Sequence, residues 1–265
     1  MTFPKVHFTL CKRCVIALIL FAAFNILVGQ FTNIDLSIED YYFDMHTHTF
    51  LWKNTWFAKD FMHGYLKDII TVIGRLLLLI VLLDLIYPWF KPRFYSWLMF
   101  KQRKNNQNLV NNRIIKPWWR VRLRFVAIAS LVIPSVVAII KYFSALHCPW
   151  DLARYGGFAP FVRLFDAMPT MIKAGQCFPA GHATVGLWLA ALCVFWLPYK
   201  PKMAFLVFLL GLSIGFALGW VQQMRGAHFL FHTLWSVWLA ALVIVVMLSF
   251  TKQLQSTNQL TNQAK

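Results

Sequence analysis

Two histidines stand at the edges of apolar runs, where a titratable ring is a poor choice for a purely structural cap. His182 follows a Pro-Ala-Gly sequence and opens one run, and His228 stands just before another. His232 comes four residues after His228, so a helix would carry both on one face. Imidazole has an ordinary pKa of about 6.5, exchanges protons near neutral pH and is a competent nucleophile. These residues therefore predict acid–base and nucleophilic chemistry, provided that the fold brings the rings together.

The composition indicates the kind of fold that must position them. Of the 265 residues, 59% are hydrophobic and 13% are charged, and the mean hydropathy is +0.58, which favours an integral membrane protein over a soluble domain. A bilayer core needs roughly 20 apolar residues as helix. Six such spans are predicted, at 14–34, 69–90, 122–143, 183–199, 203–221 and 229–250. The expected fold class is therefore all-α, a polytopic membrane protein of six transmembrane helices.

The charge distribution orients these spans. The chain has 26 Lys and Arg against nine Asp and Glu, a net charge of +17. Such a surplus could indicate nucleic acid binding. However, ten of the basic residues lie in 91–124, which has no acid, and this favours a cytoplasmic loop and anionic lipid instead. Both termini are then cytoplasmic, and the segments 35–68, 144–182 and 222–228 lie outside.

Two details of the spans are open to test. The first span follows a basic start, so a cleaved signal peptide is the alternative to the uncleaved anchor that we expect. Arg75 and Asp84 interrupt the second span, and charged side chains are costly in lipid. We expect both to face the bundle, and snorkelling or structural pairing rather than a proton path.

Three separated blocks share the outside face. The first is Lys141, six residues, then Cys148 and Pro149; the second is 179–182; the third is Gln222, five residues, His228, three residues and His232. Their order and spacing resemble the type 2 phosphatidic acid phosphatase (PAP2) superfamily, whose pattern is K-x6-RP, PSGH and SR-x5-H-x3-D. The departures are Cys148 and Gln222 for arginines, Ala180 for serine and His232 for aspartate. The RGAHFL sequence around His228 looks like bacterial members.

This resemblance implies roles for individual residues. His228 is expected to be the nucleophile that forms a phosphohistidine, and His182 the general acid for the leaving oxygen. Phosphoryl transfer also needs positive charge around the equatorial oxygens. Lys141 would supply part of it, with Arg154 and Arg225 in place of the missing arginines. Gly181 and the free N–H groups that follow it are expected to bind phosphate oxygens. No cofactor and no metal are implied.

The nucleophile also needs a group that fixes its tautomer, which is usually a carboxylate. No Asp or Glu follows Asp166 in the sequence. Two candidates remain open for this orienting role: a neutral His232 as hydrogen-bond acceptor, or Asp151 folded across from the loop.

A disulfide is predicted between Cys148 and Cys177. Both lie in the loop 144–182 on the side assigned as oxidising, and no other cysteine is expected there. The bridge would close a loop of about 30 residues, worth roughly 3–4 kcal/mol in the chain-entropy model. It would also give a reason for cysteine where the family has arginine.

Three regions follow from this interpretation: two helices with a basic loop at 1–118, a PAP2-like catalytic core at 119–250 and a polar cytoplasmic tail at 251–265. The expected function is a lipid-phosphate phosphatase, with lipid phosphate substrates and membrane lipids as partners and no nucleic acid. The expected location is a bacterial inner membrane, with the active site on the periplasmic side. Two alternatives stay open, a catalytically silent lipid-binding protein of the same fold and a lipid phosphotransferase.

Overall fold

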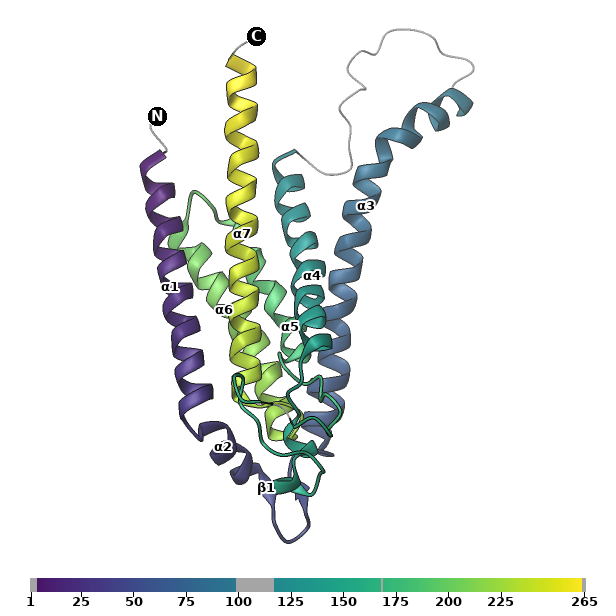
Figure 1. Cartoon of the computed structure of the whole chain (residues 1–265). Coiled ribbons are helices and arrows are strands. Elements are labelled where there is room, and N and C mark those ends of the chain that lie inside the picture. Colours follow the sequence, from purple (N-terminus) through teal and green to yellow (C-terminus); the bar gives the residue numbers. More distant parts are fainter. Residues whose placement is uncertain (1–3, 99–116, 168, 264–265) are drawn as a thin grey trace.

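The computed structural model describes residues 4–98, 117–167 and 169–263, and it is built almost entirely of helices (Figure 1). The long helices are α1 (Pro4–Phe31), α3 (Lys67–Leu98), α4 (Pro117–Phe143), α6 (Pro201–Met224) and α7 (Leu230–Gln263). The shorter elements are α2 (Ile34–Tyr42), β1 (Phe43–Asp44), β2 (Thr49–Phe50), η1 (Trp56–Leu66), η3 (Pro149–Asp151), η4 (Ala153–Tyr155), α5 (Gly181–Leu187) and η5 (Trp188–Phe195). The predicted all-α class is confirmed.

Five helices are long and apolar enough to cross a membrane, at Lys12–Phe31, Trp56–Tyr87, Trp119–Phe143, Pro201–Met224 and Leu230–Phe250. The chain is therefore an integral membrane protein. The predicted fourth span is the shorter apolar helix Gly181–Phe195, so the count of six full-length spans is near but not met among the described residues. Its second half, η5, is a 3-10 helix. Because a 3-10 helix rises about 2.0 Å per residue, α5 and η5 together extend about 26 Å, close to the thickness of a bilayer core.

The second span begins earlier than predicted. Sequence reasoning placed its start at 69 and assigned 35–68 to an outside loop, but the helix begins with η1 at Trp56 and continues into α3. The hydroxyl of Thr55 accepts a hydrogen bond from the backbone N–H of Ala58 and caps this start. Lys59 and Asp60 are exposed on the helix surface and interrupt the apolar run. This early start makes His63 a helical residue.

Small residues hold α5 and η5 tightly against α6. A Cβ added to Gly211 would lie 2.2 Å from the backbone nitrogen of Ala190, and one added to Gly215 would lie 2.7 Å from that of Leu187. Side chains of any size would therefore force the helices apart. Close backbone approach through small residues is a common way for membrane helices to associate. Here it fixes the helix that His182 begins.

The two charged residues within the second span have different surroundings. Asp84 is buried, and its carboxylate lies 2.9 Å from Nε of Arg120 and 3.3 Å from an Nη atom of Arg124 on α4. This is the structural pairing that the sequence predicts. Arg75, by contrast, is exposed on the outer surface of the bundle. The expectation that it faces the bundle is wrong, because its place on α3 points away from the neighbouring helices.

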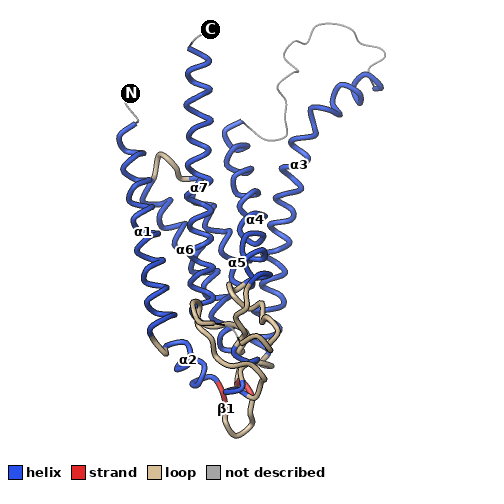
Figure 2. Tube along the Cα trace, in the orientation of Figure 1, coloured by secondary structure: helices blue, strands red, loops and turns tan. Residues whose placement is uncertain are grey.

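Most of the non-helical segments gather at one end of the molecule, around the β1–β2 hairpin (Figure 2). α1 begins and α7 ends at the opposite end (Figure 1). The segments 35–68 and 144–182 and the start of the last span meet in one buried cluster of Phe43, Phe50, Leu152, Tyr155, Ala159 and Phe229. The backbone N–H of Trp150 also donates to the carbonyl of Gly226 at 3.0 Å, so the three segments predicted to be outside lie together. α7 continues as helix through most of 251–265, and the centre of the basic segment 91–124 lies outside the described residues.

Candidate active site

His228 lies in the tight turn that joins α6 to α7. The turn depends on Gly226, whose φ of 73° lies in the left-handed region that favours glycine. A Cβ there would also lie 2.3 Å from the ring of Phe50. The backbone N–H of Ala227 donates to the carbonyl of Gln222 at 2.9 Å and closes the turn. His228 is consequently held at 2% exposure just before α7 begins.

The N-terminus of α7 is held by a residue far away in sequence. Asp35, from α2, is buried, and its Oδ1 accepts a hydrogen bond of 3.1 Å from the backbone N–H of Phe231. A carboxylate at this position satisfies free N–H groups of the first helical turn and interacts favourably with the helix dipole. The segment before α3 therefore takes part in positioning the turn that carries His228.

The second block is bound directly to α7. The backbone N–H of Ala180 donates to the carbonyl of His232 at 3.1 Å, and the hydroxyl of Ser236 donates to the carbonyl of Ala180 at 2.9 Å. Ala180 itself is fully buried, where the serine of the family pattern would stand. These bonds fix the start of α5, and with it His182, relative to the turn of His228.

The two histidines and the lysine of the first block come together. The ring centroids of His182 and His228 are 6.2 Å apart. The ammonium of Lys141, at the end of α4, lies 4.0 Å from the point where a Cβ on Gly181 would stand. Both rings and the ammonium of Lys141 thus gather in one place.

Burial keeps the ring of His228 neutral. Desolvation lowers the pKa of His228 well below its ordinary value, and electrostatic interactions with His232, Lys141 and His182 lower it further. A neutral imidazole keeps a free lone pair at neutral pH, which an attack on phosphorus requires. The burial of His228 therefore keeps a ring nitrogen unprotonated near neutral pH.

Arg225 is the second cation beside the site. Its Nη1 donates to the side-chain oxygen of Gln222 at 2.9 Å, and its Nε donates to the carbonyl of Lys53 at 3.2 Å. Gln222 occupies the arginine position of the family pattern. The side-chain amide of Gln222 therefore binds the guanidinium of Arg225, three residues later in the sequence. Arg225 also lies close enough to His182 to interact with it electrostatically.

Sequence reasoning missed His63. Its ring, carried by η1, lies 4.3 Å from the ring of His182 between centroids, closer than His228 does. Its Nδ1 is buried and has no hydrogen-bond partner among the described residues. No motif marks His63, because its segment was assigned to a loop. The one available signal was its position on the same side of the membrane as His182, directly before the second span.

Three predicted site residues are not joined to His228 by hydrogen bonds in the described part of the chain. Arg154 is paired with Asp40 through bonds of 2.8 and 2.6 Å and is largely exposed, so its predicted role as a phosphate ligand is not supported. Asp151 accepts the backbone N–H of Cys148 at 3.3 Å instead of reaching across to the nucleophile. His232 is buried with its ring centroid 5.9 Å from that of His228, and its Nδ1 has no partner in that same part.

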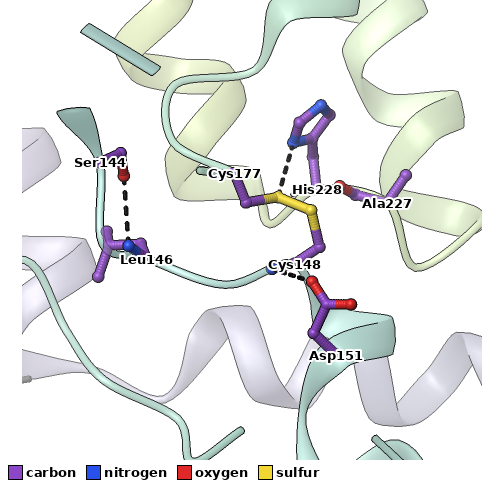
Figure 3. The surroundings of a disulfide bond; sticks show 7 residues. All are labelled: Ser144, Leu146, Cys148, Asp151, Cys177, Ala227 and His228. Atoms are coloured by element: carbon purple, nitrogen blue, oxygen red, sulfur yellow. Dashed lines mark hydrogen bonds between the residues drawn. A yellow bond between two sulfur atoms is a disulfide. The ribbon is translucent and has the colours of Figure 1, made fainter. Parts of the chain in front are cut away.

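Cys148 and Cys177 form the predicted disulfide, with Cα atoms 5.3 Å apart and a sequence separation of 29. The bridge ties the end of the α4 segment to the approach of the second block, next to His228 (Figure 3). The two sulfurs and a ring nitrogen of His228 lie within 4.8 Å of one another, the spacing of a metal site. Sulfurs joined in a disulfide are not thiolates, however, and thiolate is the form that binds metal. This group therefore does not fit a metal ion.

Comparison with known proteins agrees with the geometry. The model of the PAP2 superfamily matches residues 119–256, more than half of the chain. This range contains all three blocks, from α4 to α7. No curated protein and no solved structure matched the chain. Asp35, Lys53 and His63, which contact the site from outside this range, belong to the segment that precedes the match.

Proposed function

The chain belongs to the PAP2 superfamily, whose members generally have a phosphatase-type function, and from this membership we propose that it is a membrane lipid-phosphate phosphatase. The proposal is that it hydrolyses a phosphomonoester or pyrophosphate through a phosphohistidine. The observation that carries it is the pair of rings of His182 and His228, 6.2 Å apart beside Lys141.

In the first step, a ring nitrogen of His228 attacks phosphorus, and the bond from phosphorus to the leaving oxygen breaks. Burial lowers the pKa of His182 to about 3 in the free protein, whereas a bound phosphate anion would raise it, and the protonated ring then donates its proton to that oxygen. Lys141 and Arg225 offset the negative charge on the equatorial oxygens. In the second step, His182 takes a proton from water, whose oxygen attacks phosphorus. The bond to His228 then breaks and phosphate is released.

A lipid substrate is supported by a groove beside the site. The groove runs along the outer end of α4, and Ile139, Ile140 and Phe143 line it with Phe178. Phe178 packs edge to face on the ring of His232 at 5.6 Å, so the apolar wall adjoins the histidines. An amphiphile could place its chain along this wall and its phosphate beside Lys141, which lies on the same turn of α4.

We further propose that the site faces the periplasm of a bacterium from the inner membrane, with both termini in the cytoplasm. The basic segment 91–124 supports this orientation. In Figure 1, the start of α1 and the end of α7 lie at the end of the molecule opposite the hairpin and the site.

The test is phosphate release from a panel of lipid phosphates and one water-soluble phosphomonoester. We expect release from the lipids, loss of at least a thousandfold in His228→Ala, and near wild-type activity in His46→Ala, a control on the exposed hairpin. Unchanged activity in His228→Ala would remove this residue from the nucleophile role. Lipid binding without turnover would favour the silent protein, for which the departures at Gln222 and His232 argue. Transfer of phosphate to a second lipid would favour the phosphotransferase.

A further inference from the structure

The disulfide next to His228 occupies the place where a nucleophilic histidine needs an orienting partner. Sγ of Cys177 lies 3.4 Å from Nδ1 of His228, and the same sulfur lies 3.3 Å from the carbonyl oxygen of Ala227 (Figure 3). Cys177 is fully buried and His228 nearly so. The contact is therefore shielded from water, where a hydrogen bond contributes more than at the surface.

No carboxylate takes this place among the described residues that surround the ring. Asp151, the one acid drawn in Figure 3, accepts the backbone N–H of Cys148. Asp35 acts on the backbone of α7 and not on the ring. The family aspartate position holds His232, whose ring makes no hydrogen bond to that of His228 within the same region.

The chemistry of a disulfide decides which tautomer this contact favours. A sulfur in a disulfide carries no hydrogen and can only accept. Nδ1 of His228 must then be the donor, and the proton of the neutral ring stays on Nδ1. The lone pair is left on Nε2, the nitrogen that must attack phosphorus.

We propose that the Cys148–Cys177 disulfide is the orienting partner of His228, in place of a carboxylate, and that the site is fully active only while this bond is oxidised. Cys177 is thereby a positioning residue. The inference rests on the proposed function, since it assigns a role around the nucleophile of that reaction.

Reduction of the disulfide should reverse the tautomer preference of His228. A dithiol reductant gives two electrons and two protons to the bridge, the S–S bond breaks, two thiols form and the reductant becomes a cyclic disulfide. The Cys177 thiol is then a donor as well as an acceptor. It can donate to Nδ1, which moves the ring proton to Nε2 and blocks the attack.

The first experiment compares two double variants that both lack the cross-link. Cys148→Ala/Cys177→Ala removes the partner of Nδ1, whereas Cys148→Ala/Cys177→Asp restores an acceptor that cannot donate when ionised. We expect roughly a tenfold loss of kcat in the first, consistent with one hydrogen bond, and recovery of most of it in the second. An equal loss of kcat in both variants would show that the disulfide acts only as a structural cross-link and would overturn the proposal.

Reduction of the wild-type protein gives the matching test. Dithiothreitol should lower kcat roughly tenfold, with recovery after reoxidation, and it should leave Cys148→Ala/Cys177→Ala unaffected. An unchanged kcat in fully reduced protein contradicts the proposal.

A second measurement does not depend on activity. The ¹⁵N chemical shifts of the His228 ring, assigned by comparison with His228→Gln, should show a protonated Nδ1 and a bare Nε2 in the oxidised protein and a shift toward protonated Nε2 after reduction. A protonated Nε2 in the oxidised protein overturns the inference. If the wild type releases no phosphate but shows the expected shifts, the proposed function fails while the orienting contact stands.

Discussion

Asp35 should make the stability of this protein depend on pH in a sense opposite to that of most carboxylates. Burial raises its pKa from 3.8 to about 6, and the hydrogen bonds from Phe231 and Leu230 offset only part of this. Between these two pH values, the folded state binds the proton that the unfolded state has released. The stabilising contribution is therefore fully present below about pH 3.8 and is lost as the pH rises through about 6.

The magnitude follows from the two pKa values. One unit corresponds to about 1.4 kcal/mol, so the full contribution is about 3 kcal/mol, of which about 2 to 3 kcal/mol is lost between pH 4 and pH 7.5. Asp35→Asn cannot titrate, but its amide oxygen can still accept the N–H of Phe231. We expect this variant to gain about 2 to 3 kcal/mol relative to wild type over that range.

The assay is reversible unfolding in mixed micelles at several pH values, with the variant compared to wild type at each. Asp44→Asn is the matched control, because bonds from the backbone of His46 and from Thr47 lower the pKa of Asp44. Its difference from wild type should have the opposite sign, since a carboxylate with a lowered pKa stabilises the fold above its unfolded pKa. If Asp35→Asn keeps the pH dependence of wild type, the carboxylate does not bear the desolvation that its burial implies.

Three further substitutions test the positions of other groups. Gly211→Ala should lower the free energy of unfolding by about 1 to 3 kcal/mol and reduce activity, because the added Cβ would lie 2.2 Å from the backbone of the helix that leads to His182. Gly64→Ala is the control and should be neutral in unfolding assays, because the nearest atom to its Cβ is 3.6 Å away. Arg225→Ala should lower kcat/KM about a hundredfold and Arg154→Ala less than threefold in phosphate-release kinetics; similar losses in both would refute the assignment. His63→Gln should lower kcat roughly tenfold with little change in unfolding, and an unchanged rate would exclude His63 from the reaction.

The sequence carried enough information for the helices and for the three blocks, because both depend on local patterns. Apolar runs of sufficient length identify membrane helices, and the spacing around Lys141, His182 and His228 survives in a linear pattern. The start of the second span was predicted too late in the sequence. Lys59 and Asp60 interrupt the apolar run, but the helix continues through them. The hydrophobic pattern alone could not distinguish that segment from a loop.

Contacts between segments far apart in the sequence could not be predicted from local patterns. Arg154 follows the first block closely, but the acid that pairs with it, Asp40, lies 114 residues earlier, and only the folded loop brings them together. The bond from Asp35 to the start of α7 spans 196 residues and has no sequence signal. The disulfide was an exception, because two cysteines in one outside loop leave a single pairing within that loop.

We expect His228 to carry the phosphoryl group during turnover. The most direct test is rapid acid-free quenching of the protein with a labelled lipid phosphate, followed by mass-spectrometric mapping of the modified residue. The expected result is a phosphoryl group on His228, absent from His228→Ala and present at a reduced level in His182→Ala. A phosphoryl group on His182, His232 or His63, or phosphate release from His228→Ala at the wild-type rate, would contradict the claim.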